Sequence, residues 1–485
     1  MVNTVKWAFA VGHVFNDLCS SIWFLFTMPY FTKVLALENY FAGDIILIGQ
    51  IADAIATQLV GIESDKVGII CHKYIGQRKS WHLFGTILCA LSFPFIYNSF
   101  FKESLNYEWF LVIYYSPFVI MFQIAWAIVQ ITHLSLIPVL MNLGQDNSTL
   151  NSLRYMFTVA SNVIVLTATT LLFNACYSNN PLMSNSSTPA TVDQSATALG
   201  PKDKITFTYL TIGVVVLGLF FSFLFHLGVP EITKGKESDS VDSSINTDPS
   251  TPLLSSSNEK MNIKDWFKEP QFYLINLLYL ATRLIVNVSQ VYLILYVIDS
   301  LGMTKMQSSL AALTTFISGA VTSFLLKIVQ KRIGKKLCYL TGLVFIMSFC
   351  VMVSFSYIFM DLWKMYLSMA LLGIGCSVIM IGSLSLTADL IGKSCSSSSF
   401  VYGSMSFSDK LFSGLVIWIM QRLGPLTAEC SKCRNFYQNI EIYFVGGCAT
   451  FAFVMLLIIY PMKIGSRWKD RVINVEDNST ETINS

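Results

Sequence analysis

Apolar segments long enough to cross a lipid bilayer follow one another along almost the entire chain. A helix needs roughly 20 residues to span about 30 Å of hydrocarbon. Hydrophobic residues make up 54% of the sequence and charged residues only 13%, against a charged share of about 25% in soluble domains. We therefore predict an all-α membrane protein with twelve transmembrane helices, at residues 7–31, 42–62, 81–98, 109–138, 151–175, 206–228, 271–298, 306–328, 337–359, 363–391, 399–421 and 441–463.

The distribution of basic residues predicts the orientation of the chain in the membrane, because short loops rich in lysine and arginine stay in the cytosol. Such clusters follow the second, eighth and last predicted spans, at Lys66, Lys73, Arg78 and Lys79, at Lys331, Arg332, Lys335 and Lys336, and at Lys463, Arg467, Lys469 and Arg471. Both termini are therefore expected in the cytosol. The loop 176–205 then lies on the opposite side, where Asn185 begins an Asn-Ser-Ser glycosylation sequon.

Residues 230–270 divide the chain into two halves. This segment is rich in Ser, Asp, Glu, Lys and Pro and has no apolar period, which predicts a flexible cytosolic linker. The expected parts are a six-helix bundle at 1–229, the linker, a second six-helix bundle at 271–463 and a cytosolic tail at 464–485.

Two smaller features accompany this division. An apolar helix that runs into a basic turn occurs in both halves, at Gly43–Trp81 and Ser318–Lys336, which indicates an internal repeat. Within the linker, Leu253 and Leu254 follow Asp248 at a spacing similar to that of an acidic dileucine signal. They are either a sorting signal read by an adaptor or two ordinary leucines in a linker.

Polar side chains recur at helical spacing within several predicted spans, so that each set shares one helix face. The sets are His13, Asn16, Asp17 and Ser20; Gln50, Asp53 and Thr57; Gln123, Trp126, Gln130 and His133; Arg154, Thr158, Ser161 and Asn162; Arg283, Asn287 and Gln290; and Ser406, Asp409, Lys410 and Ser413. A charge inside a bilayer costs at least a few kcal/mol and normally faces a bundle interior or a watery path. The charged members therefore indicate either a functional site or structural ion pairs between helices.

The sequence argues against several other classes of function. A net charge of +3, with no basic patch interleaved with aromatic residues, does not suggest nucleic-acid binding. We expect neither an enzyme nor a metal or cofactor site, because no nucleophile–base set, metal-ligand spacing or phosphate loop is present. Cys430 and Cys433 are close in sequence and are able to form a disulfide if their loop faces an oxidising lumen.

Several motifs together resemble a known family. They are Gly12–Asp17, the DAI at 53–55 with Gly61, GQRKSW at 76–81, Ser135-Leu-Ile-Pro138 followed by Asp146, Leu150 and Arg154, and Phe407-x-x-Lys410-x-x-x-Gly414-Leu415. They resemble the glycoside-pentoside-hexuronide:cation symporter branch of the major facilitator superfamily, in both halves of the chain. The resemblance implies two six-helix bundles that rock about a central cavity and carry a small-molecule substrate across the lipid bilayer.

A narrower resemblance covers most of the chain. The strings GHVFNDLCSSIWF, QITHLSLIP, TRLIVNVSQ, TADLIG and FVYGSMSFSDK are similar to those of cysteine importers of lysosomes and melanosomes. This resemblance implies that the protein moves cysteine from the cytosol into the lumen of those organelles. The alternatives are a cation-coupled symporter of sugars or another small polar metabolite, and a membrane scaffold or receptor that transports nothing.

The sequence also departs from the sugar symporters of that branch. Those proteins place two aspartates one turn apart in the second span, whereas here only Asp53 remains and Thr57 stands at the second position. Gln130 and Leu134 stand where they have a sugar-binding acid and a stacking tryptophan. These changes argue against a sodium-driven sugar mechanism and favour a small zwitterion.

The polar sets and the resemblance together predict the functional residues. An amino acid needs an acceptor for its ammonium group and a cation for its carboxylate, and arginine can grip a carboxylate with two bonds. The predicted substrate-binding residues are Asp17, Arg154, His133, Gln130, Arg283, Asn287 and Gln290. The predicted coupling and gating residues are Asp53, Thr57, Asp409, Lys410, Asp65 and Arg78, with Asp53 and Lys410 as a charge pair and the loop holding Asp65 and Arg78 as either a cytosolic latch or an anchor to anionic lipid.

Overall fold

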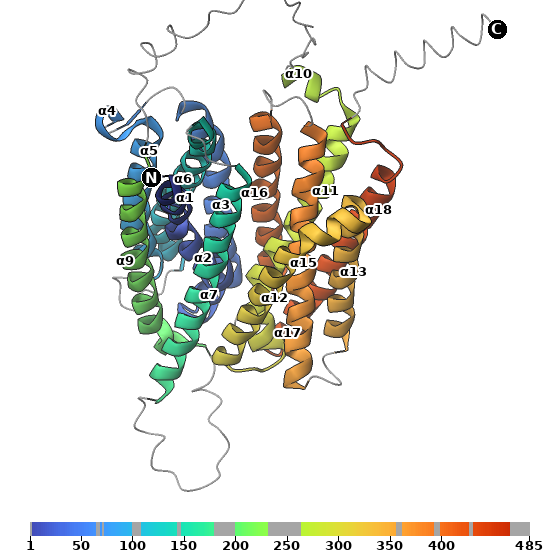
Figure 1. Cartoon of the computed structure of the whole chain (residues 1–485). Coiled ribbons are helices and arrows are strands. Elements are labelled where there is room, and N and C mark those ends of the chain that lie inside the picture. Colours follow the sequence, from blue (N-terminus) through green and yellow to red (C-terminus); the bar gives the residue numbers. More distant parts are fainter. Residues whose placement is uncertain are drawn as a thin grey trace, which may run out of the picture.

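The computed structural model describes residues 2–64, 68–69, 72–98, 108–142, 147–178, 199–230, 263–355, 361–391, 398–425 and 430–465. Within these ranges the chain is almost entirely helical and contains no strand. The helices form two bundles that stand side by side, the first drawn from blue to green and the second from yellow to red (Figure 1). The predicted all-α membrane fold, with twelve transmembrane helices in two bundles, is confirmed.

The first bundle contains the N-terminal spans. Its first span consists of α1 (Val2–Val11), α2 (Val14–Pro29) and a π-helical turn, η1 (Tyr30–Val34). The others are α3 (Asn39–Glu63), α5 (Gln77–Ile96), α6 (Glu108–Asn142), α7 (Asn147–Ser178) and α9 (Lys204–Gly228), with the short α4 (His72–Ile75) and η3 (Pro201–Asp203) between them.

The second bundle repeats this pattern. Its first span is α11 (Pro270–Leu295) with the π-helical turn η4 (Tyr296–Ser300), and the short α10 (Ile263–Trp266) precedes it. The others are α12 (Lys305–Ile333), α13 (Lys335–Ser354), α15 (Leu362–Ile391), α16 (Ser398–Leu423) and a last span made of α17 (Cys430–Asn439), η6 (Ile440–Phe444) and α18 (Val445–Ile459).

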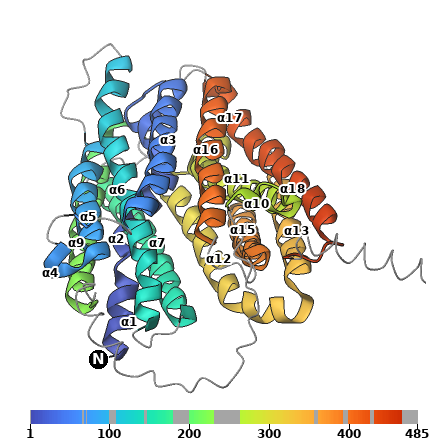
Figure 2. The same ribbon diagram turned by 90° about the horizontal axis from the view of Figure 1, so that it is seen from above.

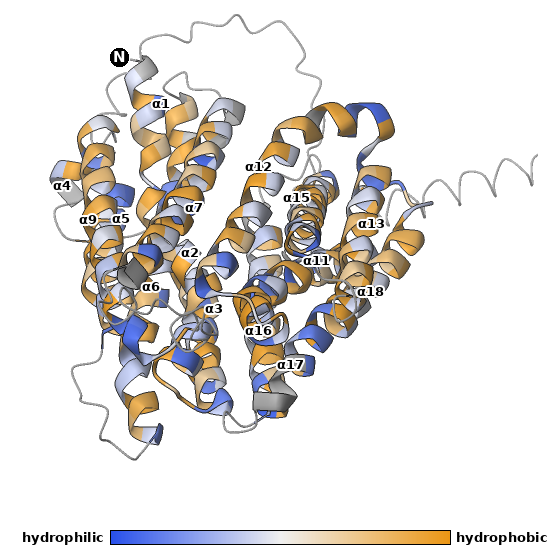
Figure 3. Ribbon diagram, turned by 90° about the horizontal axis from the view of Figure 1, so that it is seen from below, coloured by the Kyte–Doolittle hydropathy of each residue, from blue (hydrophilic) through white to orange (hydrophobic). Residues whose placement is uncertain are grey.

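The outer faces of the bundles are apolar, as lipid contact requires. Ten helical segments in the described ranges are long and apolar enough to cross a membrane, and the two remaining long helices, α5 and α16, begin with polar turns. On α9 the side chains of Val216, Phe220 and Phe223 are all more than half exposed. Such a surface would be a liability in water but is expected in contact with acyl chains. Figure 3 shows the apolar colouring along the outward helices of both bundles.

A basic turn occupies equivalent places in the two bundles. Gly76 and Gly334, with φ angles of 96° and 83°, precede α5 and α13 in a conformation that favours glycine. The Lys79 ammonium then donates to the His226 and Val229 carbonyls at the end of α9 (3.0 and 2.7 Å). Lys336 donates in the same way to the Ile459, Tyr460 and Met462 carbonyls at the end of α18 (3.0, 2.9 and 2.6 Å). These contacts satisfy carbonyls that a helix end leaves free, and they confirm the internal repeat.

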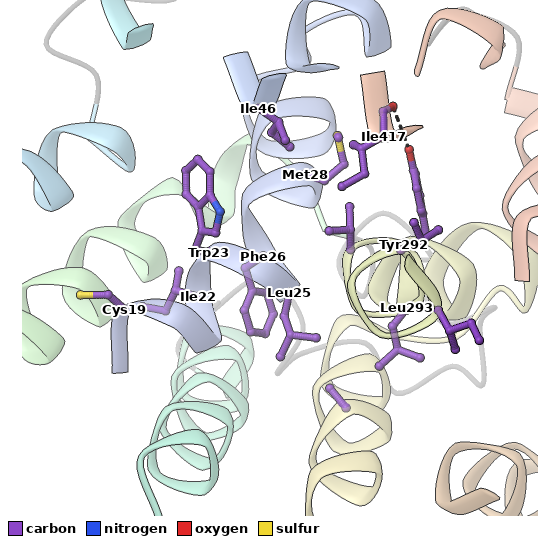
Figure 4. Packing of buried hydrophobic residues seen from close by; sticks show 14 of the residues in the cluster. Cys19, Ile22, Trp23, Leu25, Phe26, Met28, Ile46, Tyr292, Leu293 and Ile417 are labelled. Carbon is purple, nitrogen blue, oxygen red and sulfur yellow. Dashed lines mark hydrogen bonds between the residues drawn. The ribbon is translucent and has the colours of Figure 1, made fainter. Parts of the chain in front are cut away.

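Among the described residues, the main helix contacts between the two bundles are those of α2 with α11, α3 with α16 and α7 with α12. Figure 2 shows α3 and α16 next to each other along the junction. Glycine permits this close approach, because a Cβ added at Gly414 would lie 2.6 Å from the Gln50 Cβ and one at Gly43 would lie 2.8 Å from the Gln421 Cβ. The α2–α11 contact is apolar, and Figure 4 shows Leu25 and Phe26 on its α2 side.

Candidate functional site

A chain of charged and polar groups lies inside the first bundle. One guanidinium nitrogen of Arg154, Nη2, is 3.1 Å from His13 Nε2. His13 Nδ1 is 2.9 Å from Asp17 Oδ1, and the other oxygen, Oδ2, accepts a hydrogen bond of 2.9 Å from the Thr158 hydroxyl. His13 and Asp17 are each 5% exposed. The structure therefore brings together Asp17 and Arg154, both predicted substrate-binding residues, with His13 between them.

The first span is interrupted where this chain of groups begins. Helix α1 ends at Val11, Gly12 and His13 form a turn, and α2 starts at Val14. A Cβ at Gly12 would lie 2.3 Å from the Phe225 ring, so a larger residue there would have to displace that ring. Discontinuous transmembrane helices are typical of substrate sites in transporters.

Two further histidines bond to backbone carbonyls at this interruption. His133 Nε2 is 2.8 Å from the Phe9 carbonyl and His82 Nε2 is 3.0 Å from the Gly12 carbonyl, and both side chains are fully buried. The His133 ring also stacks on Phe9, with ring centroids 4.2 Å apart. His133 was predicted to bind substrate, and the structure places it in the packed interior against α1.

The second bundle holds its own buried ion pair. Arg283 Nε donates to Asp409 Oδ2 over 2.7 Å, and Asn287 Nδ2 donates to Asp409 Oδ1 over 2.8 Å. The Ser413 hydroxyl also contacts Asp409 Oδ1 (3.2 Å), and Asn287 Nδ2 lies 3.0 Å from the Ser413 hydroxyl. A buried carboxylate with these partners is fully satisfied, so the charge can remain inside a transmembrane bundle.

A third charged pair links the two bundles. The Lys410 ammonium on α16 donates to Asp53 Oδ1 on α3 and lies 2.5 Å from the Thr57 hydroxyl, which itself donates to Asp53 over 3.2 Å. One turn further along, Gln58 Nε2 donates to the Gly403 carbonyl over 2.9 Å. The predicted pairing of Asp53 with Lys410 is thus present in the structure, and it crosses the junction between the bundles.

A small cavity lies between the bundles, with room for about one water molecule. Its lining comes from α2, α3, α11 and α16: Trp23, Phe24, Met28, Ile46, Gln50, Asn287, Val291, Ser413 and Ile417. Figure 4 labels four of these residues around the apolar contact of α2 with α11. Of the predicted substrate-binding residues only Asn287 lines this cavity. Asp17 lies six residues before Trp23 on α2, or about 9 Å along the helix axis.

The other predicted site residues occupy separate places. Gln130 accepts a hydrogen bond of 3.1 Å from the Trp126 indole on α6, and Gln290 is half-buried on α11. Arg78 lies in the first turn of α5. The remaining predicted positions fall outside the described residues or have side chains that are not described: Asp65, Asn185, Leu253, Leu254, Cys430 and Cys433.

Sequence reasoning missed a group of ion pairs at the end of the molecule opposite the basic turns. Lys33 Nζ on η1 lies 2.8 Å from Asp299 Oδ2 on η4, and Lys305 on α12 pairs with Asp203 on η3. Both pairs join one bundle to the other. A signal for the first was present, since Tyr-Phe-Thr-Lys-Val at 30–34 and Tyr-Val-Ile-Asp-Ser at 296–300 occupy equivalent places in the repeat and carry opposite charges at the fourth position.

The two-bundle fold, the interrupted first span and the charge pair across the junction define a membrane transporter of the major facilitator type. The structure superposes on the inward-open xylose transporter XylE of E. coli with a TM-score of 0.63 over 97% of both chains, at 12% identity, so this likeness concerns the fold.

Residues 8–466 match the model of the MFS/sugar transport protein family, and the chain belongs to that family. It is 38% identical over 468 residues to the horse protein named major facilitator superfamily domain-containing protein 12. The aligned region covers 95% of this chain and 94% of the horse protein. The human protein of the same name is 38% identical over 469 residues, with the same coverage.

Proposed function

We propose that this transporter moves cysteine from the cytosol into the lumen of lysosomes and melanosomes by alternating access. The observation that supports the substrate class is the group formed by Arg154, His13 and Asp17, in which opposite charges lie apart in one site inside the first bundle. A free amino acid carries the same two charges. Its carboxylate would bind the guanidinium and its ammonium group would bind the carboxylate.

Arg154 has hydrogen-bonding capacity for such a ligand. Its Nε is buried and has no hydrogen-bond partner in the described part of the chain. An unpartnered buried donor is costly, and a substrate carboxylate would remove that cost. On a guanidinium, Nε–H and one Nη2–H point the same way, so a carboxylate could dock on both and take the place of His13 at Nη2.

The junction pair supports a mechanism that needs no sodium. The Lys410 ammonium already neutralises Asp53, and Thr57 supplies a hydroxyl where the sugar symporters have a second acid. A sodium ion prefers several oxygen ligands with net negative charge, and this position offers one carboxylate that is already paired. The alternative, a cation-coupled symporter of sugars or another polar metabolite, is therefore less well supported. Proton symport from an acidic lumen would drive export, so import favours facilitated diffusion.

The cellular part of the proposal comes from the sequence. The organelles follow from the resemblance of several strings to lysosomal and melanosomal cysteine importers, and the cytosolic termini follow from the positive-inside rule. The division into bundles at 1–229 and 271–463, with a linker at 230–270, belongs to the same proposal, as do an adaptor signal at Leu253–Leu254 and a glycan at Asn185.

Replacing Arg154 tests the site. Arg154→Ala should abolish cysteine uptake into vesicles while the amount of protein in the membrane stays the same. Arg332→Ala is the matched control, because Arg332 is exposed at the end of α12 and belongs to none of the buried pairs. Normal uptake by Arg154→Ala, at normal abundance, would remove Arg154 from the substrate site.

A further inference from the structure

The hydrogen bonds around His13 determine which of its ring nitrogens carries the proton. A guanidinium can only donate, so His13 Nε2, which lies 3.1 Å from Arg154 Nη2, must accept with its lone pair. The proton of a neutral imidazole is then on Nδ1, where it is donated to Asp17 Oδ1 over 2.9 Å. His13 is therefore a neutral imidazole that accepts from a cation at one end and donates to an anion at the other.

This arrangement prevents the two charges from pairing with each other. Arg154 and Asp17 are both close to His13, yet neither contacts the other directly among the described residues. Asp17 uses its second oxygen for the Thr158 hydroxyl, and Arg154 keeps a buried Nε without a partner. A direct ion pair would satisfy both side chains and leave nothing for a ligand. The imidazole keeps each charge available.

The imidazole also resembles the proposed ligand in its hydrogen-bonding groups. It presents an acceptor to Arg154 and a donor to Asp17, and an α-amino acid presents a carboxylate and an ammonium group in the same order. The two ends of an amino acid are charged, so they make stronger hydrogen bonds than the neutral ring does. An amino acid can therefore displace His13 from both partners at once.

We propose that His13 is a specificity-determining spacer that holds Arg154 and Asp17 apart for a ligand with both a carboxylate and an ammonium group. The proposal rests on the proposed function and extends it to the ligand class. A zwitterion restores charge balance at both ends, so it binds without a coupled ion. A ligand with only one charged end leaves half of the exchange unmade and binds less tightly.

A purely structural role is the competing explanation, because His13 is also the residue that precedes α2. Two substitutions separate the roles. In His13→Gln, the amide can accept from Arg154 and donate to Asp17, as the imidazole does. In His13→Leu, the side chain can do neither, and Arg154 is free to pair with Asp17. His226→Gln is the control, since His226 contacts His82 (3.2 Å) and neither Arg154 nor Asp17.

The experiment measures KM and kcat for labelled cysteine with purified protein in liposomes. His13→Leu should raise KM about tenfold or more, because cysteine must break a new ion pair, with kcat changed less than about threefold. His13→Gln should stay within about threefold of wild type in KM, and His226→Gln should be unchanged. Cysteamine, which lacks the carboxylate, and 3-mercaptopropionate, which lacks the ammonium group, should compete at least about tenfold more weakly than cysteine.

Other results would overturn the proposal that His13 is a spacer. It is wrong if His13→Leu has the wild-type KM, if His13→Leu and His13→Gln lose affinity equally, or if the single-charge analogues compete as well as cysteine does. Thermal unfolding of each variant in detergent identifies a folding defect. If His13→Leu does not fold, the competition by the single-charge analogues against wild-type protein still tests the proposal. Wild-type protein that transports no cysteine would refute the proposed function and the spacer together, whereas active wild type with an unchanged His13→Leu refutes the spacer alone.

Discussion

Removing the Lys410 ammonium should disable the junction between the bundles. Lys410→Met leaves Asp53, which is 5% exposed, with Thr57 as its remaining hydrogen-bond partner in the described chain. Breaking a buried pair by removing one partner costs about 3–5 kcal/mol, because the other charge stays buried without compensation. Since 1.4 kcal/mol is tenfold in an equilibrium constant, the conformation in which α3 contacts α16 should lose more than about a hundredfold in population.

A double-mutant cycle measures this effect. Cysteine uptake in liposomes and thermal unfolding in detergent are compared for wild type, Lys410→Met, Asp53→Asn and the double variant. Each single variant should be strongly impaired in both assays. The double variant should be less impaired than the sum of the two single-variant effects predicts, because it leaves no unpaired charge. The interaction energy between the two substitutions should be about 0.5–3 kcal/mol. If the effects of the two substitutions are additive, the ion pair is not the contact that controls the junction.

The remaining predictions concern other parts of the fold. Charge reversal at Asp299 alone should impair transport, because Asp299 pairs with Lys33 across the two bundles, and exchange of the two charges in a Lys33→Asp/Asp299→Lys protein should restore it; a double variant as impaired as the single one would show that transport does not depend on this pair. Gly373→Ala should lower the thermal midpoint of unfolding, because its Cβ would lie 2.1 Å from the Thr315 carbonyl oxygen; an unchanged midpoint would show that α12 and α15 separate easily. Lys336→Met should destabilise the second bundle by about 1–3 kcal/mol, since three carbonyls lose a charged donor; detergent unfolding checks this, and an unchanged transition would contradict it.

Hydrophobic segment lengths were sufficient to predict the helices. The predicted spans overlap every long helix, including α5 and α16, which are too polar to satisfy a simple hydropathy criterion. The basic turns before α5 and α13 were also visible, because glycine and lysine occupy them in both halves. What length and composition could not predict is the interruption of the first span, since a single glycine costs a helix only about 1 kcal/mol.

The charges of the candidate site were recognisable, but most of their pairings were not. Asp17, Arg154, Arg283 and Asp409 stood out because bare charges are rare inside a bilayer. Their partners depend on how helices distant in sequence pack, so the placement of His13 between Arg154 and Asp17 became visible only in three dimensions. His133 is a further case. It shares a helix face with polar residues, which the sequence showed, but its bond to the Phe9 carbonyl became visible only in the packed structure.

Uptake of labelled cysteine by the purified wild-type protein in sodium-free liposomes tests the central claim most directly. The account predicts saturable uptake that proceeds to equilibrium and that sodium does not stimulate. Unlabelled cysteine should compete with this uptake, and sugars should not. Uptake that requires sodium, or competition by sugars at concentrations where unlabelled cysteine has no effect, would contradict it.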